Sequence, residues 1–292
     1  MNKEELIQFL QANKIWAKKN MGQNFLVDDE VLAKIVEAAD LKSTDTVIEI
    51  GPGLGVLTEE LVSRAGRVVA IEKDDFLAEL LNQISNIKNP RRVSYRKKND
   101  KVKIKIVNED ALDLDLSAYS LQLTAYDYKV VANIPYNITS AIIRKFLEAD
   151  NKPELMVLLV QKEVAERIVA RPGEMSLLSV SVQFYADVEI VDIVKSTSFF
   201  PLPKVESAII KLKTKSEKRK VKEADLFRIV KFGFASRRKT LENNLAAGLH
   251  ISKTEASDII KSAGLSEKIR AQELTIEDWL KLYNVVNSKI KN

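Results

Sequence analysis

Residues 46–55 read TVIEIGPGLG, and this stretch decides the fold. Its first half is apolar and β-branched apart from Glu49, which is the composition of a buried strand. Gly51, Gly53 and Gly55 follow, and a helical pattern begins directly after them. Glycine lets the backbone turn sharply and approach a ligand closely. A strand, a glycine loop and a helix in this order indicate a site for a nucleotide-type cofactor.

Strand-like and helix-like stretches alternate along the chain around this element. Such alternation predicts a mostly parallel sheet with helices on both faces, the α/β class. The expected strands are 46–50, 67–71, 104–107, 130–131 and 155–160, with two more near 188–194 and 207–212. The expected helices between them are 56–64, 74–84, 138–148 and 162–170.

The composition changes at a lysine-rich linker, residues 213–222, and the pattern is helical from there to the end. A chain of 292 residues is also long for one compact domain. We therefore expect two domains: residues 1–214, which carry the sheet and the cofactor site, and residues 215–292, which are all-α. Residues 91–105 alternate in the manner of a β-hairpin inserted into the sheet domain.

The composition excludes several kinds of chemistry. The chain contains no cysteine and one histidine, His250, so thiolate sites and histidine metal clusters are excluded, and we expect no metal. A single histidine also argues against Ser-His-Asp catalysis. No apolar run approaches 18 residues, and the first residues lack the apolar core of a signal peptide. We expect a cytoplasmic protein with no membrane partner.

Positive charge is clustered more than its total suggests. The formal net charge is only +5, from 46 basic and 41 acidic residues. Lysines gather within residues 14–19, basic residues recur within residues 91–98, and Arg237-Arg238-Lys239 forms a third group. Phosphate binding depends on such local potential, so the clusters indicate a nucleic-acid partner. For the 91–105 segment, two roles are equally open: a basic hairpin that contacts RNA, or a hairpin that is simply exposed to solvent.

Acidic side chains follow two further strands of the expected sheet. Glu72 ends the second strand, and Asp110 follows the third. Open α/β sheets bind ligands at the carboxyl ends of their strands. A carboxylate at Glu72 can accept hydrogen bonds from both ribose hydroxyls of NAD or of S-adenosylmethionine. Asp110 can accept from a cofactor adenine amino group, although a helix N-cap or a turn is also a common role for aspartate.

Asn133-Ile134-Pro135-Tyr136 follows the fourth strand and distinguishes between NAD and S-adenosylmethionine as the cofactor. The amide oxygen and a nearby backbone carbonyl can accept both protons of an exocyclic amino group. Proline stiffens the turn, and the tyrosine ring can stack on a base. A dehydrogenase has no use for such a group, so S-adenosylmethionine is the expected cofactor. The same tetrapeptide taken alone also suits an ordinary turn into a helix.

In these motifs and in several further blocks, the chain resembles the small-subunit ribosomal RNA adenine dimethyltransferases. The resemblance implies a Rossmann-like class I methyltransferase sheet and S-adenosylmethionine as cofactor. It implies as substrate two adjacent adenines in the 3′-terminal hairpin of small-subunit rRNA within an immature ribosomal subunit, each to be dimethylated. It also implies a part in small-subunit biogenesis, and we expect a monomer. The shared blocks are 22–26 (GQNFL), 49–55, 133–136, 161–167 (QKEVAER), 199–207 (FFPLPKVES), 234–245 (FASRRKTLENNL) and 270–274 (RAQEL).

The resemblance also implies roles for particular residues. The implied cofactor-binding residues are Asn24, Leu26, Gly51, Gly53, Glu72, Asp110 and Asn133. The implied catalytic residues are Asn133, Pro135, Tyr136 and Phe199, the last two as stacking partners of the target base. Core packing is the competing role for Phe199 and its neighbour Phe200. The implied RNA-binding residues are Arg237, Arg238 and Lys239. Glu109 departs from the family, which often has glycine at this position.

Three alternatives remain open from the sequence. A large-subunit rRNA adenine methyltransferase of the erythromycin-resistance type would share the fold, the cofactor and residues 133–137, but the blocks at 199–207 and 234–245 favour the small-subunit group. An assembly or transcription factor descended from the enzyme would not need Glu72, Asp110 and Asn133. A nicotinamide oxidoreductase is the most distant alternative.

Overall fold

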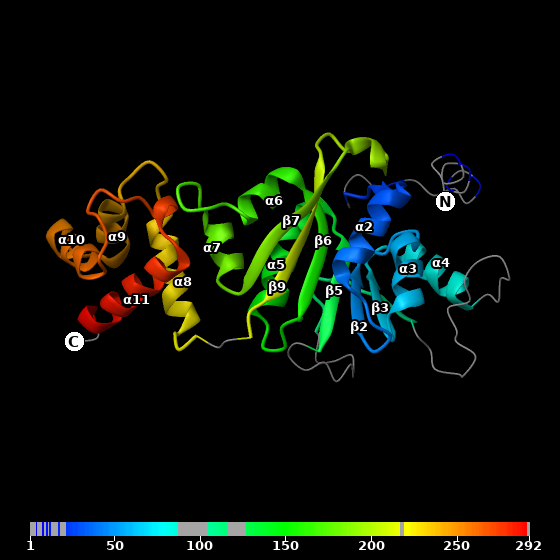
Figure 1. The fold of residues 1–292 in the computed structure, drawn as a ribbon, viewed down its shortest axis with the longest axis horizontal. Helices are drawn as coiled ribbons and strands as arrows, with labels where there is room; N and C mark the ends of the chain where they lie inside the picture. The colour runs from blue at the N-terminus through cyan, green and yellow to red at the C-terminus, as the bar shows by residue number, and fades with distance from the viewer. Residues whose placement is uncertain are drawn as a thin grey trace. The chain divides into compact units, whose positions relative to one another are not determined.

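The computed structural model describes residues 22–86, 104–115, 127–216 and 219–290, together with a few isolated positions before residue 22. These residues form two compact units. The first comprises residues 1–165 and 187–214, and the second comprises residues 166–186 and 215–292. Figure 1 labels the elements of both units in chain order. The hairpin predicted for residues 91–105 lies almost entirely outside the described residues.

The first unit is built on a sheet of seven described strands in the order β4-β3-β2-β5-β6-β9-β7. Strands β4, β3, β2, β5 and β6 pair in parallel, whereas β9 is antiparallel to β6. The order reverses beside β2, so the carboxyl ends of β2 and β5 flank a crevice where such sheets bind ligands. The bounds are β2 (Thr46–Ile50), β3 (Arg67–Glu72), β4 (Ile104–Asn108), β5 (Tyr128–Asn133), β6 (Leu155–Gln161), β7 (Ala186–Val194) and β9 (Ser207–Thr214).

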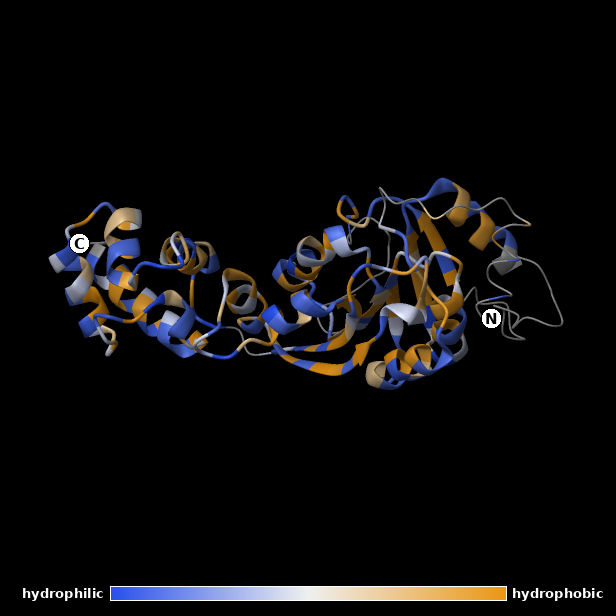
Figure 2. Ribbon diagram, turned by 90° about the horizontal axis from the view of Figure 1, so that it is seen from above, coloured by the Kyte–Doolittle hydropathy of each residue, from blue (hydrophilic) through white to orange (hydrophobic). Residues whose placement is uncertain are grey.

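Helices cover both faces of this sheet, as predicted. One core cluster joins α2 and α3 to Val131 and other strand residues of a single face. Tyr128 points to the opposite face, since side chains alternate along a strand, and its ring lies 6.4 Å from that of Phe146 on α5. Figure 2 shows the apolar residues concentrated on the strands between these helices. The helices are α2 (Asp29–Ala39), α3 (Val56–Arg64), α4 (Asp75–Asn86), α5 (Thr139–Glu148) and α6 (Lys162–Ile168).

A short strand pair ties the segment before α2 to the rest of the first unit. β1 (Phe25–Leu26) is antiparallel to β8 (Phe199–Phe200). Asp28 caps α2 by accepting from the Glu30 and Val31 amides, and it also accepts from the Ser198 hydroxyl at 2.7 Å. Residues 25–28 are thereby held by both β8 and the first turn of α2.

The second unit is helical and includes a segment that was predicted to belong with the sheet. Phe184 and Tyr185, which follow α7 (Leu177–Gln183), both contact the ring of Phe227 on α8. This aromatic contact explains why residues 166–186 group with the helices and not with the sheet. Trp279, 1% exposed, fills the centre of the unit. The remaining helices are α8 (Glu223–Gly233), α9 (Leu241–Leu249), α10 (Lys253–Ser262) and α11 (Ile276–Ile290). Among the described helices, none combines the length and apolarity that crossing a membrane requires.

Candidate active site

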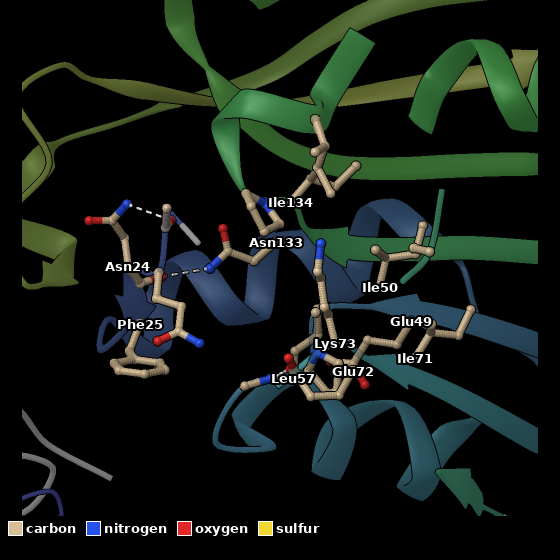
Figure 3. A pocket seen from close by; sticks show the side chains of 18 of the residues that line it. Asn24, Phe25, Glu49, Ile50, Leu57, Ile71, Glu72, Lys73, Asn133 and Ile134 are labelled. Carbon is tan, nitrogen blue, oxygen red and sulfur yellow. Dashed lines mark hydrogen bonds between the residues drawn. The ribbon is translucent and has the colours of Figure 1, made fainter. Parts of the chain in front are cut away.

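A pocket lies at the carboxyl edge of the sheet, where the ends of four parallel strands and the segment before α2 meet. Figure 3 shows labelled side chains from the segment before α2 and from the ends of β2, β3 and β5 around this pocket. The pocket is lined by residues 22–26 before α2, by 49–54, 71–73 and 133–138 at the carboxyl ends of β2, β3 and β5, and by 109–111 after β4. All the predicted cofactor residues line it, and so do Pro135 and Tyr136. Their roles stay predictions, but their convergence on one cavity is a property of the fold.

The glycine loop has the backbone geometry that its sequence indicated. Gly51 has φ +65°, Gly53 has φ +57° and Gly55 has φ +83°, values that residues with a side chain rarely adopt. The Gly53 amide donates to Glu72 Oε2 at 3.1 Å. The loop and the acid at the end of β3 are therefore held together as one wall of the pocket.

Glu72 is a buried carboxylate held at both oxygens. Its Oε1 accepts from the Asp74 amide at 2.9 Å, while its side chain is 6% exposed. Burial raises the pKa of Glu72, and the hydrogen bonds from the Asp74 and Gly53 amides oppose that rise. Each carboxylate oxygen has a second lone-pair direction, so Glu72 can still accept hydrogen bonds from a ligand.

Glu49 also lines the pocket, although no role was predicted for it. It is 1% exposed, and its Oε2 has no hydrogen-bond partner. Burial raises the pKa of Glu49 to about 8, the nearby Thr58 hydroxyl opposes the rise, and the charge of Glu72 adds to it. The signal in the sequence was an acid inside an otherwise apolar strand, immediately before the glycine loop.

Asp110 is paired with a lysine that was not predicted as part of the site. Lys73 Nζ lies 2.6 Å from Asp110 Oδ2, and the Leu112 amide donates to Oδ1 at 2.9 Å. The hydrogen bond from Lys73 lowers the pKa of Asp110, and the Leu112 amide lowers it further. Asp110 is therefore ionised and oriented at the pocket edge, and a lysine directly after Glu72 was the signal for this pair.

The amide of Asn133 is oriented by the segment before α2. Its Nδ2 donates to the Asn24 backbone carbonyl at 3.1 Å, the contact drawn in Figure 3. With the nitrogen engaged, the amide oxygen is the atom that can accept from a ligand. The Pro135 carbonyl accepts from the Ile138 amide at 3.1 Å in the turn η2 (Tyr136–Ile138), and it retains a second lone pair.

Tyr136 is half-buried in the pocket wall, and its hydroxyl lies 2.7 Å from Ser207 Oγ. Burial raises the pKa of Tyr136, so the phenol is neutral at physiological pH. Ser207 is fully buried at the start of β9, and in the sequence it stood out only as the last residue of a shared block.

Phe199 lies apart from the other predicted catalytic residues. It is 0% exposed, belongs to the same core cluster as Leu26 and Ile35, and does not line the pocket. The pairing of β8 with β1 turns its ring into the core, and Phe200 packs instead beside Phe25 and Leu77. In this structure Phe199 packs in the core, which is the competing role, and the stacking role stays a prediction.

The three predicted RNA-binding residues lie in the other unit, in the turn between α8 and α9. Arg237, Arg238 and Lys239 are all exposed there. The turn is held from inside by Asn244, whose Nδ2 donates to the carbonyls of Gly233 at 2.6 Å and Ser236 at 3.0 Å. Within the described ranges, no cluster of three or more acidic or histidine side chains is placed to hold a metal ion.

The sheet order, the glycine loop and the strand-end carboxylates together define a class I methyltransferase, the class predicted from the sequence. The chain belongs to the ribosomal RNA adenine dimethylase family, whose model matches residues 15–288. This membership confirms that the protein is an enzyme that dimethylates adenine in ribosomal RNA.

Individual relatives agree with this membership. Ribosomal RNA small subunit methyltransferase A of Dehalococcoides mccartyi is 44% identical over 274 residues, which cover 93% of this chain and 89% of the relative. The crystal structure of a dimethyladenosine transferase from Plasmodium falciparum superposes with a TM-score of 0.75 at 27% identity, covering 91% of this chain and 98% of that one. The crystal structure of the 23S rRNA methyltransferase ErmE superposes with a TM-score of 0.67 at 28% identity, covering 90% of this chain and all of that one.

Proposed function

We propose that this protein transfers methyl groups from S-adenosylmethionine to the N6 amino groups of two adjacent adenines in the 3′-terminal hairpin of small-subunit rRNA, dimethylating each. The observation that carries the proposal is the Asn133 amide, which the Asn24 carbonyl orients inside a pocket shared with Glu72 and the glycine loop. The small-subunit assignment is supported by the name of the relative from Dehalococcoides mccartyi.

The pocket suits S-adenosylmethionine through its hydrogen-bond acceptors and its glycine backbone. Glu72 would accept from the ribose hydroxyls and Asp110 from the adenine amino group, while Gly51 and Gly53 let the main chain come close. Glu72 places a buried carboxylate in the cavity, which favours a ligand that carries positive charge. When bound, the cofactor supplies a methyl group activated by a sulfonium.

The residues after β5 would hold the amino group that receives the methyl. The Asn133 amide oxygen and the Pro135 carbonyl can accept one proton each, which favours a more pyramidal nitrogen with an available lone pair. These acceptors would also stabilise the positive charge that develops on the nitrogen. Holding the amino group in line supplies most of the acceleration, so no strong general base is needed. Tyr136 would support the base by stacking.

We further propose a division of labour between the two predicted domains. Residues 1–214 would bind the cofactor and perform the transfer, and residues 215–292 would grip rRNA phosphates through Arg237, Arg238 and Lys239. The substrate would be an immature small ribosomal subunit in the cytoplasm, and the protein would act as a monomer with a part in small-subunit biogenesis.

Mass spectrometry of both ribosomal RNAs from cells lacking this protein tests the proposal. We expect dimethyladenosine to disappear from the 3′ hairpin of small-subunit rRNA and to return with the wild-type gene but not with Asn133→Ala. Loss from large-subunit rRNA alone would overturn the small-subunit assignment. It would favour the second candidate, a large-subunit methyltransferase, which the match to ErmE keeps open.

A further inference from the structure

We infer that Ser207 is a positioning residue for Tyr136: by holding the tyrosine hydroxyl from a neighbouring strand, it fixes the ring against which the target base stacks. This inference rests on the proposed function, since it assumes that a base enters the pocket beside Tyr136. The two oxygens lie 2.7 Å apart although the residues are 71 positions apart in the sequence.

The strand pairing explains why a serine at this position can reach the tyrosine. Asn133, at the end of β5, is opposite Leu159 of β6, and Ser207 is opposite Gln161 near the end of the same strand. Tyr136 therefore reaches past the carboxyl end of β6 to the first residue of β9. Two further contacts hold the segment before Ser207: the Lys162 amide donates to the Glu206 carbonyl at 3.0 Å, and Lys162 Nζ lies 2.9 Å from Glu206 Oε2.

The hydrogen bond with Ser207 restricts the Tyr136 ring at its hydroxyl end. The backbone of η2 fixes the Cβ end of Tyr136, and Ser207 fixes the oxygen end, so the ring cannot swing about its first side-chain torsion. A stacking surface that is held before the base arrives does not lose side-chain freedom on binding, and that loss is a recognised cost of association. The expected consequence of the bond is tighter or better-placed binding of the RNA substrate.

Ser207 acts only through Tyr136. It is 0% exposed and does not line the pocket, whereas Tyr136 does. The tyrosine hydroxyl is engaged with Ser207, and burial raises the pKa of Tyr136, so the phenol does not take up a proton from the substrate amine. A different role for the bond would be to stabilise the fold by tying η2 to β9, and that role would show in thermal stability without changing substrate binding.

The test compares Ser207→Ala, Tyr136→Phe and the double variant with wild-type protein. The substrate is small ribosomal subunits from cells lacking this protein, and the measurements are kcat, KM for the subunits, Kd for S-adenosylmethionine and Tm. We expect Ser207→Ala to raise KM about three- to tenfold, the range for one lost buried hydrogen bond. Tyr136→Phe should have a similar effect, and the double variant should match the single ones because all three lack the same bond.

The matched control is Tyr128→Phe, at the other end of β5. The Tyr128 hydroxyl donates to the Asn151 carbonyl at 2.7 Å, so this variant loses an equally short tyrosine bond away from the pocket. It should lower Tm to a similar extent and leave KM for the subunits unchanged. The Kd for S-adenosylmethionine should stay within about twofold of wild type in every variant, because each change removes only a hydroxyl to which no cofactor contact is assigned.

The possible outcomes separate this inference from the proposed function. An unchanged KM in Ser207→Ala, or additive effects in the double variant, would overturn the positioning role while leaving the proposed function intact. A rise in KM as large in Tyr128→Phe as in Ser207→Ala would show a general loss of stability and would also overturn it. Wild-type protein that does not methylate small subunits would instead overturn the proposed function, and the inference with it.

Discussion

The carboxyl edge of the sheet and the turn between α8 and α9 both carry ionisable side chains, but the two regions hold them in opposite ways. At the sheet edge, Glu49 and Glu72 are 1% and 6% exposed, and Glu72 is held by backbone amides. In the turn, Arg237, Arg238 and Lys239 are exposed, and the side chain of Asn244 fixes the backbone beneath them. A buried, pre-oriented set suits one small ligand, whereas exposed cations suit phosphates whose positions vary.

The largest expected effect comes from removing the Asn133 amide, the oriented polar group at the carboxyl edge of the sheet. Asn133→Ala should lower kcat for methyl transfer at least about a hundredfold, the cost of removing one pre-oriented polar group from an active site. Tm should change little, because the side chain is half-buried at a strand end. Single-turnover methylation of small subunits measures the effect.

Asn24→Ala is the matched control for this prediction. It removes the neighbouring amide but keeps the Asn24 backbone carbonyl that orients Asn133. Its loss of kcat should therefore be much smaller. Wild-type turnover in Asn133→Ala would contradict the assigned role of the amide.

The next effect concerns the buried carboxylate that would hold the cofactor ribose. Glu72→Gln keeps the shape but loses the charge, and its NH2 group takes the place of one of the two oxygens that accept from the Gly53 and Asp74 amides. The Kd for S-adenosylmethionine should rise about ten- to a hundredfold, since a charge-assisted hydrogen bond contributes roughly 1.5–3 kcal/mol. Isothermal titration calorimetry measures it, with the exposed Glu37→Gln on α2 as control. Equal affinities in the two variants would remove Glu72 from the cofactor site.

The exposed cations in the turn between α8 and α9 should affect RNA binding and its salt dependence, whereas the buried groups at the sheet edge should affect cofactor binding and methyl transfer. Replacing Arg237, Arg238 and Lys239 together by alanine should weaken binding to small subunits and reduce the slope of log K against log salt. The reduction should reach up to about three, or about one for each phosphate that the variant no longer neutralises. The Kd for S-adenosylmethionine should not change. A salt slope identical to that of wild type would show that these side chains do not contact phosphate.

The last expected effect is on stability and its pH dependence, not on activity. The folded pKa of Glu49 is raised to about 8, above the ordinary value of 4.5, so the folded protein binds a proton more tightly than the unfolded chain. The stability that comes from holding this proton is fully present below about pH 4.5 and is lost as pH rises towards 8. Glutamine cannot ionise, so Glu49→Gln should gain stability relative to wild type over this window, by an amount on the order of a few kcal/mol.

Urea unfolding at pH 5, 7 and 9 measures this difference. The exposed Glu37→Gln should run parallel to wild type at all three values. Parallel curves for Glu49→Gln would mean that Glu49 is ionised in the folded protein at neutral pH.

Much of the candidate site could be predicted because its residues are placed by strand ends. Gly51, Glu72, Asp110 and Asn133 each follow an apolar strand, and parallel strands bring their carboxyl ends to one edge. Phe199 could not be placed in this way. Its role depends on which face of the short β8 strand meets the core, and that is decided by pairing with β1, a segment more than 170 residues earlier.

Two further features depend on contacts distant in the sequence. Residues 166–186 join the helical unit because Phe184 and Tyr185 pack on Phe227, which no local pattern indicates. Glu49 is visible as an acid in an apolar strand, but its raised pKa depends on how completely α3 and the neighbouring strands exclude water.

The sequence by itself determined the α/β class, the family and the strand ends that carry the polar groups, because periodicity and short motifs are local properties of the chain. Only the tertiary structure decided which partners those groups have. The Asn24 carbonyl orients Asn133, Lys73 pairs with Asp110, and Ser207 holds Tyr136. Each of these interactions joins residues 37 to 109 positions apart, so it exists only once the strands and the segment before α2 have been brought together.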